Sequence, residues 1–268
     1  MKVFCNGTII EKETLAEVFE PGFLFGWGVF ETLRAYKGKV PFLDRHVKRL
    51  DAGLARIGIE GTKVDYAQEI TKLLKENGLD DAYIRITAYK KRESTGVLIY
   101  VDKFGYYPDS AYEKGFTAII SKYKRDTSNP LYNIKAISNL ENRLAWHEAQ
   151  LVKKDEALVL NKKGYLAGGS RSNVFLVKNN KAFTPSIEHG AFCGITRWLI
   201  IKELNNSRIK VFSKQLTVND LLSADEAFLT SALLEVMPLV ECGGKLIGSG
   251  KPGPLTLKTL SRYRELLK

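Results

Sequence analysis

The spacing of apolar side chains divides the chain into short strands and amphipathic helices. Alternating or continuous short apolar runs, bounded by Gly, Pro, Asn or Asp, are typical of strands. These runs predict strands over residues 2–4, 29–36, 40–43, 82–89, 96–101, 116–121, 156–160, 173–177, 227–230, 236–241 and 245–247. Apolar side chains three and four positions apart predict helices over residues 44–57, 64–76, 139–151, 196–204, 218–222 and a C-terminal segment from Pro254.

Two hairpins are expected from turn residues, one at Asn6-Gly7 and one around Gly243-Gly244. Strands and helices mix without a regular βαβ alternation, which favours an α+β fold over a doubly wound sheet. No GxGxxG or Walker-type loop opens a helix, so a Rossmann or P-loop enzyme is not expected.

The length of 268 residues fits two modest domains. The segment 105–115 holds Gly105, Pro108 and Gly115, and it reads as a linker. We therefore expect a small N-terminal domain over residues 1–104 and a larger one over residues 116–268.

The composition is that of a soluble globular protein, with 44% hydrophobic and 26% charged residues. No apolar run is long enough to cross a bilayer, and the first residues lack the features of a secretory signal. A cytoplasmic protein with no membrane partner is the expectation. Three cysteines and three histidines show no metal-ligand spacing, so no metal site is expected.

A net charge of +11 raises the question of a nucleic-acid partner. Lys and Arg are spread along the whole chain, and no nucleic-acid-binding motif accompanies them. A solvated basic surface is the better interpretation, with steering of an anionic ligand second. No nucleic-acid partner is expected.

Three segments hold residues that suit chemistry. Gly194-Ile195-Thr196 opens a helix, where backbone N–H groups and a hydroxyl can hold a phosphate. Arg49 lies on a predicted helix with a basic face. Lys135 is flanked by apolar residues, and burial turns a lysine into a nucleophile. Taken one at a time, a helix cap, a solvated face and a surface lysine explain them as well.

Taken together, the ordered motifs resemble the fold-type IV family of pyridoxal-phosphate enzymes over essentially the whole chain. That family, also called the class IV aminotransferases, includes branched-chain aminotransferases, D-amino acid aminotransferases and 4-amino-4-deoxychorismate lyases. The matching segments are Phe25-Gly26-Trp27-Gly28-Val29-Phe30-Glu31-Thr32-Leu33-Arg34, Asp44-Arg45-His46-Val47-Lys48-Arg49-Leu50, Ile134-Lys135, Asn139-Leu140, Asp155-Glu156-Ala157-Leu158-Val159-Leu160, Ser172-Asn173-Val174-Phe175, Cys193-Gly194-Ile195-Thr196-Arg197, Asp225-Glu226-Ala227-Phe228-Leu229-Thr230-Ser231 and Glu235-Val236-Met237-Pro238.

The resemblance implies a two-domain α+β fold with pyridoxal 5′-phosphate in the interdomain cleft, and a homodimer that acts on a small primary amine. It implies that Lys135 bonds to the cofactor and moves a proton at the substrate carbon. The residues expected to hold the cofactor, Lys135 included, are Arg49, Lys135, Ile195, Thr196, Ser231 and Ala232. The residues expected near the substrate are Phe30, Thr32 and Lys90.

Two positions depart from the family pattern. Gly168 stands where relatives carry a Glu that pairs with the pyridine nitrogen of the cofactor, and glycine supplies no charge there. A water, Ser170 or another neighbour would have to replace it. Lys90 stands where many relatives have an Arg-Gly pair that binds substrate carboxylates, so this work is left to Lys90 or Arg92.

The sequence ranks three functions. Thr32 and the run from Ser231 to Leu234 resemble the lyase, which releases pyruvate from 4-amino-4-deoxychorismate and leaves 4-aminobenzoate for folate synthesis. The lyase is therefore the first expectation. An aminotransferase for branched-chain or D-amino acids is second. Gly168 keeps open a third class, a cofactor-binding relative with weak catalysis.

Overall fold

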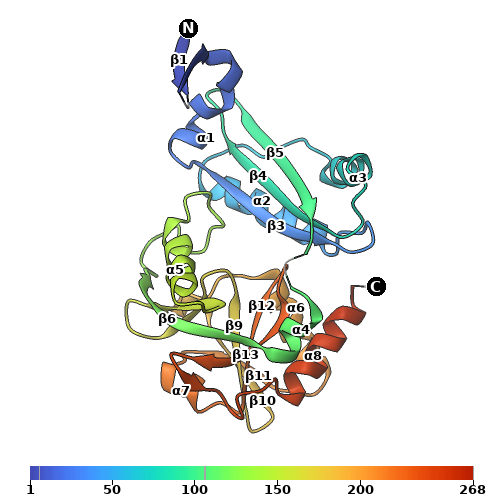
Figure 1. Cartoon of the computed structure of the whole chain (residues 1–268), viewed down its shortest axis with the longest axis vertical. Helices are drawn as coiled ribbons and strands as arrows, with labels where there is room; N and C mark the ends of the chain where they lie inside the picture. The colour runs from blue at the N-terminus through green and yellow to red at the C-terminus, as the bar shows by residue number, and fades with distance from the viewer. Residues whose placement is uncertain (6, 106, 268) are drawn as a thin grey trace. The chain divides into compact units, whose positions relative to one another are not determined.

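The computed structural model describes residues 1–5, 7–105 and 107–267. The chain divides into two compact units (Figure 1). The first contains Met1–Asp102 and Ile134–Asn139, and the second contains Lys103–Asn133 and Leu140–Lys268. The short segment 134–139, which includes Lys135, thus belongs to the first unit although it lies between two stretches of the second.

The first unit is built on a three-stranded sheet in the order β3-β4-β5. The strands are β3 (Gly28–Ala35), β4 (Ala82–Lys90) and β5 (Thr95–Lys103). One face of β3 packs on α2 (Leu43–Arg56), and α3 (Tyr66–Glu76) supplies further apolar side chains to the same core. The largest buried side chains of this core are Leu33, Leu50, Leu54, Ile70, Ile84 and Ile86.

A small N-terminal part precedes this sheet. It contains the paired strands β1 (Lys2–Cys5) and β2 (Thr8–Glu11), the 3-10 segment η1 (Lys12–Phe19) and the one-turn helix α1 (Pro21–Leu24). The predicted strand at residues 2–4 is confirmed. The turn predicted at Asn6-Gly7 falls on Asn6, which lies outside the described residues.

Within the described residues, the second unit holds a nine-stranded mixed sheet in the order β11-β10-β9-β12-β13-β6-β7-β8, with β14 paired to β13. The strands are β6 (Phe116–Arg125), β7 (Glu156–Asn161), β8 (Leu166–Gly169), β9 (Asn173–Lys178), β10 (Lys181–Pro185), β11 (Val211–Lys214), β12 (Glu226–Ser231), β13 (Glu235–Cys242) and β14 (Lys245–Leu246). The strand β6 runs parallel to both β7 and β13, and β10 runs parallel to β11.

Helices pack around this sheet. They are α4 (Asp109–Lys114), α5 (Leu140–Leu151), η2 (Ile187–His189), α6 (Ile195–Asn206), α7 (Val218–Leu222) and α8 (Pro254–Glu265). The helix α5 lies against β6 and β7, whereas α8 contacts β12, β13 and α6. Phe175 and Phe228, on neighbouring strands, stack with ring centroids 4.9 Å apart in the core.

Two predicted features differ from the structure. The strand predicted over residues 40–43 is wrong, because Phe42 adopts a left-handed conformation (φ 58°) and α2 begins at the next residue. The segment expected to be a linker contains α4, where Tyr112 is buried. Short elements of this kind depend on contacts with distant parts of the chain, which a local pattern does not reveal.

None of the helices in the described part of the chain is both long and apolar enough for a bilayer crossing. Among the described residues, no group of three or more His, Cys, Asp or Glu side chains is arranged to hold a metal ion.

Candidate functional site

Lys135 lies beside the edge strand of the first unit. The Phe30 N–H donates to the carbonyl oxygen of Lys135 at 2.8 Å, and the Ile137 N–H donates to that of Gly28 at 2.9 Å. Val29 and Ala136 form an antiparallel bridge between these two bonds. The segment around Lys135 is thus paired to β3 on the side opposite β4, and this pairing fixes the backbone from which the lysine projects.

Phe30 provides the surface on which the Lys135 side chain rests. The Lys135 Nζ lies 4.5 Å from the centroid of the Phe30 ring, and the guanidinium carbon of Arg85 lies 3.8 Å from the same centroid. The face of an aromatic ring attracts cations, and this attraction strengthens when water is excluded. Phe30 is buried, so two cationic groups share one aromatic ring in a region with little solvent.

Arg49 is held by a buried carboxylate. On α2, its Nε donates to Glu31 Oε1 at 2.7 Å and its Nη2 to Glu31 Oε2 at 2.6 Å. The Nδ1 of His46, one turn earlier on the same helix, lies 2.8 Å from Glu31 Oε2. Glu31 has no exposed surface. A two-bond contact of this kind fixes the plane of the guanidinium, so Arg49 is oriented before any ligand arrives.

The charges of this cluster follow from its contacts. Burial alone would raise the pKa of Glu31, but the hydrogen bonds from Arg49 and His46 lower it to about 2, so its carboxylate is ionised. Burial lowers the pKa of His46, and the nearby cations Arg49 and Lys135 lower it further, against the opposing effect of Glu31. His46 is therefore neutral near neutral pH, while Arg49 carries the charge.

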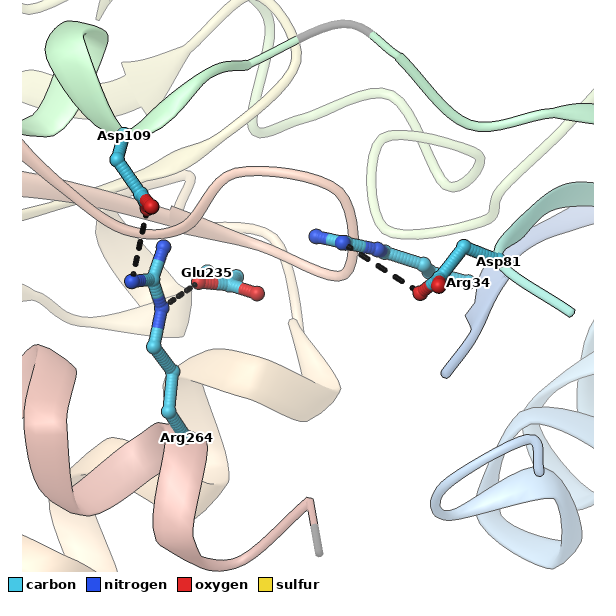
Figure 2. A network of polar contacts seen from close by, with 5 residues as sticks. All are labelled: Arg34, Asp81, Asp109, Glu235 and Arg264. Atoms are coloured by element: carbon cyan, nitrogen blue, oxygen red, sulfur yellow. Dashed lines mark hydrogen bonds and ion pairs between the residues drawn. The ribbon is translucent and has the colours of Figure 1, made fainter. Parts of the chain in front are cut away.

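The other face of the β3–β4 pair carries polar and aromatic side chains. Register places Phe30 opposite Thr87, Thr32 opposite Arg85, and Arg34 opposite Tyr83. These six side chains share one face because side chains alternate along a strand. The Arg34 guanidinium lies 4.2 Å from the Tyr36 ring centroid, and its Nη2 lies 3.9 Å from Asp81 (Figure 2).

Thr32, predicted near the substrate, therefore lies beside two arginines. Lys90 ends β4, and its N–H donates to the Trp27 carbonyl oxygen at 2.9 Å. This bond ties the Gly-rich segment that precedes β3 to the far end of β4. The predicted residues Lys135, Phe30, Thr32, Arg49 and Lys90 all belong to the first unit.

The other predicted cofactor residues belong to the second unit. Ile195 and Thr196 form the first turn of α6, and Gly194 at its N-cap contributes no side-chain hydrogen bond. The first N–H groups of a helix have no partner within the helix and attract anions. Arg197 anchors this turn, because its buried Nη2 donates to the Pro185 carbonyl oxygen at 3.0 Å and to Ser213 Oγ at 2.9 Å.

Asn173 brings the α6 N-terminus next to the end of β12. It pairs in register with Thr230, the residue before Ser231, and its side-chain amide donates to the Phe192 carbonyl oxygen at 2.9 Å. A side chain at Gly194 would collide with the Asn173 amide. Ser231 Oγ in turn accepts the Leu234 N–H at 3.1 Å, inside the turn that contains Ala232. The four predicted phosphate contacts of this unit are thus connected through one buried asparagine.

Gly168 adopts a backbone conformation that L-residues with side chains rarely take, with φ +143°. An added Cβ would lie 3.0 Å from the Ser172 carbonyl oxygen. The nearest buried carboxylate, Glu156, is engaged by the same turn: Ser170 Oγ donates to it at 2.5 Å and Ser172 Oγ at 2.9 Å. Ser170, considered above as a replacement for the missing Glu, therefore uses its hydroxyl on Glu156.

Three contributors were missed when the sequence was read alone. Glu31 and Asn173 lie inside the quoted motifs, and each is a polar residue in an otherwise apolar strand, which is the signal that marks them. Arg85 gave a weaker signal, as one of several cations in a strand with polar alternate positions. Its place over Phe30 depends on the pairing of β3 with β4.

The sequence of this chain matches the family model described as amino-transferase class IV over residues 28–242. A protein of Methanocaldococcus jannaschii with the provisional name branched-chain-amino-acid aminotransferase is 33% identical, with 99% of this chain and 96% of the relative covered. The D-alanine aminotransferase of Bacillus licheniformis is 30% identical, with 96% and 93% covered. The aminodeoxychorismate lyase of Bacillus subtilis is also 30% identical, with 99% and 94% covered.

Solved structures show the same fold. The branched-chain amino acid aminotransferase of Escherichia coli superposes with a TM-score of 0.88 at 27% identity, covering 98% of this chain and 93% of that one. The branched-chain amino acid aminotransferase of T.th., solved with pyridoxamine 5′-phosphate, gives a TM-score of 0.86 at 26% identity, covering 99% and 93%. The predicted α+β fold of the fold-type IV enzymes is confirmed.

Proposed function

Since this chain belongs to the class IV aminotransferase family, we propose that it is an aminotransferase that passes the amino group of an aliphatic amino acid to a 2-oxo acid. Its cofactor is pyridoxal 5′-phosphate. The observation that carries the proposal is the 33% identity to a branched-chain-amino-acid aminotransferase over 99% of the chain. The lyase, ranked first from the sequence alone, becomes the second candidate.

The residues present fit the cofactor by their chemistry. A phosphate dianion needs a guanidinium and backbone N–H donors, and the two units offer Arg49 and the uncapped start of α6. The aldehyde needs a lysine amine, which Lys135 offers. When bound, pyridoxal phosphate supplies an aldehyde that takes up primary amines and a ring that accepts electrons from the adjacent carbon.

Each proposed role follows from a contact. Glu31 orients Arg49 for the phosphate, and Asn173 orients the α6 N-terminus and Ser231 for the same group. Lys135 Nζ moves the proton at the α-carbon of the substrate, from a position over the Phe30 ring. Phe30 keeps water from this amine because its own ring is buried.

The polar face of β3 and β4 suits an amino acid. Arg85 and Arg34 offer charge for the α-carboxylate, and the Phe30 and Tyr83 rings offer apolar surface for an aliphatic side chain. We propose a branched-chain amino acid as the donor, because M. jannaschii and E. coli proteins with that specificity in their names resemble this chain. Arg85→Ala should raise KM for the amino acid at least tenfold, a loss of about 1.4 kcal/mol in binding, with little change in cofactor affinity.

A second candidate keeps specific support. The aminodeoxychorismate lyase of B. subtilis is about as similar as the D-alanine aminotransferase, and Thr32 and Ser231 resemble the lyase pattern. Thr32 lies beside Arg85 on the polar face, where it would contact the substrate in either reaction. The weakly catalytic relative, supported by Gly168, is the third candidate.

Three parallel assays of the cofactor-loaded protein separate these candidates. They follow glutamate formed from L-leucine or L-valine with 2-oxoglutarate, D-glutamate formed from D-alanine with 2-oxoglutarate, and pyruvate released from 4-amino-4-deoxychorismate. The proposal expects kcat/KM for the branched-chain donors to exceed the other two by at least about tenfold. Faster pyruvate release would favour the lyase, and a coloured protein without turnover in any assay would favour the weakly catalytic relative.

We also propose a homodimer. The N-terminal part of the first unit exposes three consecutive apolar side chains, Phe23, Leu24 and Phe25, the last with 74% of its surface accessible. A cluster of large exposed apolar side chains marks a contact surface in soluble proteins. A second copy of this chain is the partner that the family resemblance suggests.

A further inference from the structure

The turn between β12 and β13 is held in an unusual backbone conformation. Glu235, the first residue of β13, has φ 53°, a left-handed value that residues other than Gly, Asn and Asp rarely adopt. It is also buried, with 2% of its side chain exposed. A buried charged residue in such a conformation needs support from its surroundings, and conformations of this kind cluster at functional sites.

The support comes from the C-terminal helix. Arg264 Nε donates to Glu235 Oε2 at 2.7 Å, and Arg264 Nη1 donates to Asp109 Oδ1 at 3.1 Å (Figure 2). The Arg264 guanidinium carbon also lies 4.7 Å from the ring centroid of Tyr112 on α4. Asp109 is 82% exposed, so the contact with Glu235 is the stronger of the two.

Glu235 is directly linked to the residues expected to bind phosphate. In the β12–β13 pairing, Glu235 lies opposite Ser231, so the turn between them contains only three residues, Ala232 among them. The Leu234 N–H donates to Ser231 Oγ across this turn at 3.1 Å. A change in the backbone of Glu235 would therefore move Ser231 and Ala232, because the turn is too short to absorb it.

We propose that Arg264, acting through Glu235, is a positioning residue that sets the turn from Ser231 to Leu234 for the phosphate of the cofactor. This inference rests on the proposed binding of that phosphate by Ser231 and Ala232. It gives α8 a role beyond packing on the sheet: the charge of Arg264 holds Glu235 in the left-handed conformation, and Glu235 places the phosphate contacts. A purely structural ion pair would affect stability without distinguishing ligands that carry phosphate from those that do not.

The helix α8 offers a matched control. Arg262 lies two residues before Arg264 and pairs with Glu203, near the C-terminal end of α6, at 3.6 Å. Arg262→Ala removes an arginine and an ion pair from the same helix without touching the β12–β13 turn. Asp109→Asn removes the second, exposed partner of Arg264 and leaves Glu235 in place.

The test compares two ligands that both offer an aldehyde to Lys135: pyridoxal 5′-phosphate, and pyridoxal, which lacks the phosphate. Dissociation constants are measured by absorption for the wild type and the variants. We expect Arg264→Ala to weaken binding of pyridoxal phosphate about tenfold and to change pyridoxal binding less than about twofold. Arg264→Lys should recover part of the loss, and Arg262→Ala and Asp109→Asn should stay within about twofold of the wild type for both ligands.

Glu235→Gly carries the test where Arg264→Ala does not fold, because glycine accepts φ 53° without strain. In that background Arg264→Ala should have no further effect on binding of pyridoxal phosphate. Equal losses for both ligands, or equal losses for Arg262→Ala and Arg264→Ala, would overturn the positioning role. A wild type that binds neither ligand would instead contradict the proposed function.

Discussion

Glu31 is the buried carboxylate around which Arg49 and His46 are arranged. Glu31→Gln keeps the shape but removes the charge, and Gln cannot accept both guanidinium bonds with its amide. We expect the free energy of unfolding to fall by about 1.5–3 kcal/mol, the range for a hydrogen bond to a charged group, as measured by urea denaturation. Asp81→Asn is the control, because its contact with Arg34 is long and exposed and should cost less than about 1 kcal/mol.

Glu31 also makes stability depend on acid pH. Its folded-state pKa, about 2, lies below the ordinary value of 4.5. The stability it contributes is thus fully present above the ordinary pKa and is lost as the pH falls from about 4.5 toward about 2. Across this window, the Glu31→Gln variant should show a shallower fall in unfolding free energy than the wild type. Equal slopes for the two proteins would mean that Glu31 is not ionised in the folded state.

Gly168 shows how far this chain has moved from its family's pattern. Restoring the Glu would force a side chain onto φ +143° and bring its Cβ within 3.0 Å of the Ser172 carbonyl oxygen. We expect Gly168→Glu to destabilise the protein by roughly 1–3 kcal/mol through backbone strain and not to speed turnover. Gly164→Ala is the control, because it places a Cβ at φ +86° in open space.

Thermal denaturation and single-turnover kinetics of the two glycine variants check this. A stable Gly168→Glu protein with faster turnover would show that the turn relaxes easily and that only the charge was missing. A Gly168→Glu protein no less stable than Gly164→Ala would show that the contact with Ser172 does not matter.

At the level of elements, the start of α6 depends on Asn173 from β9. Asn173→Ala removes the bond to the Phe192 carbonyl oxygen and opens space beside Gly194. We expect the affinity for pyridoxal phosphate to fall about tenfold, which is about 1.4 kcal/mol, with a smaller effect on pyridoxal. Asn205→Ala, at the other end of the same helix, loses a bond to the Val211 N–H and should leave both affinities unchanged.

Calorimetric titration with the two ligands measures this difference. The same loss for Asn173→Ala and Asn205→Ala would mean that α6 responds as a whole and that Asn173 does not position its N-terminus.

Elements with strong local signals were predicted well. The helix predicted over residues 64–76 is observed as α3, because the Asp65 carboxylate caps it by accepting the Gln68 N–H at 3.0 Å. The hairpin around Gly243-Gly244 is confirmed, since both glycines take positive φ. By contrast, the parallel pairing of β6 with β7 and β13 joins segments far apart in sequence, and no local pattern indicates it.

The site was predicted as a set of residue types rather than as an arrangement. Lys135 was indicated by its apolar neighbours and by the family motif, but its position beside Phe30 depends on a bridge between Val29 and Ala136, more than a hundred residues apart. Glu31 was quoted in a motif without a role, because a buried carboxylate acquires meaning only when Arg49 on another element approaches it.

For the whole molecule, association can be tested directly. Phe25→Lys places a charge among the exposed side chains of Phe23 and Leu24 and should shift a dimer toward monomer in sedimentation velocity at micromolar concentration. Leu246→Lys is the control, because Leu246 is similarly exposed on β14, in the other unit. Monomer for the wild type, or equal shifts for both variants, would contradict the proposed contact surface.

The central claim is that this chain is a pyridoxal-phosphate enzyme whose cofactor bonds to Lys135. The most direct measurement is the intact mass of the whole protein after loading with cofactor and reduction with borohydride, followed by peptide mapping. The account predicts one reduced pyridoxal phosphate per chain, located at Lys135, and no such addition in Lys135→Ala. An addition at another lysine, or an equal addition in Lys135→Ala, would contradict it.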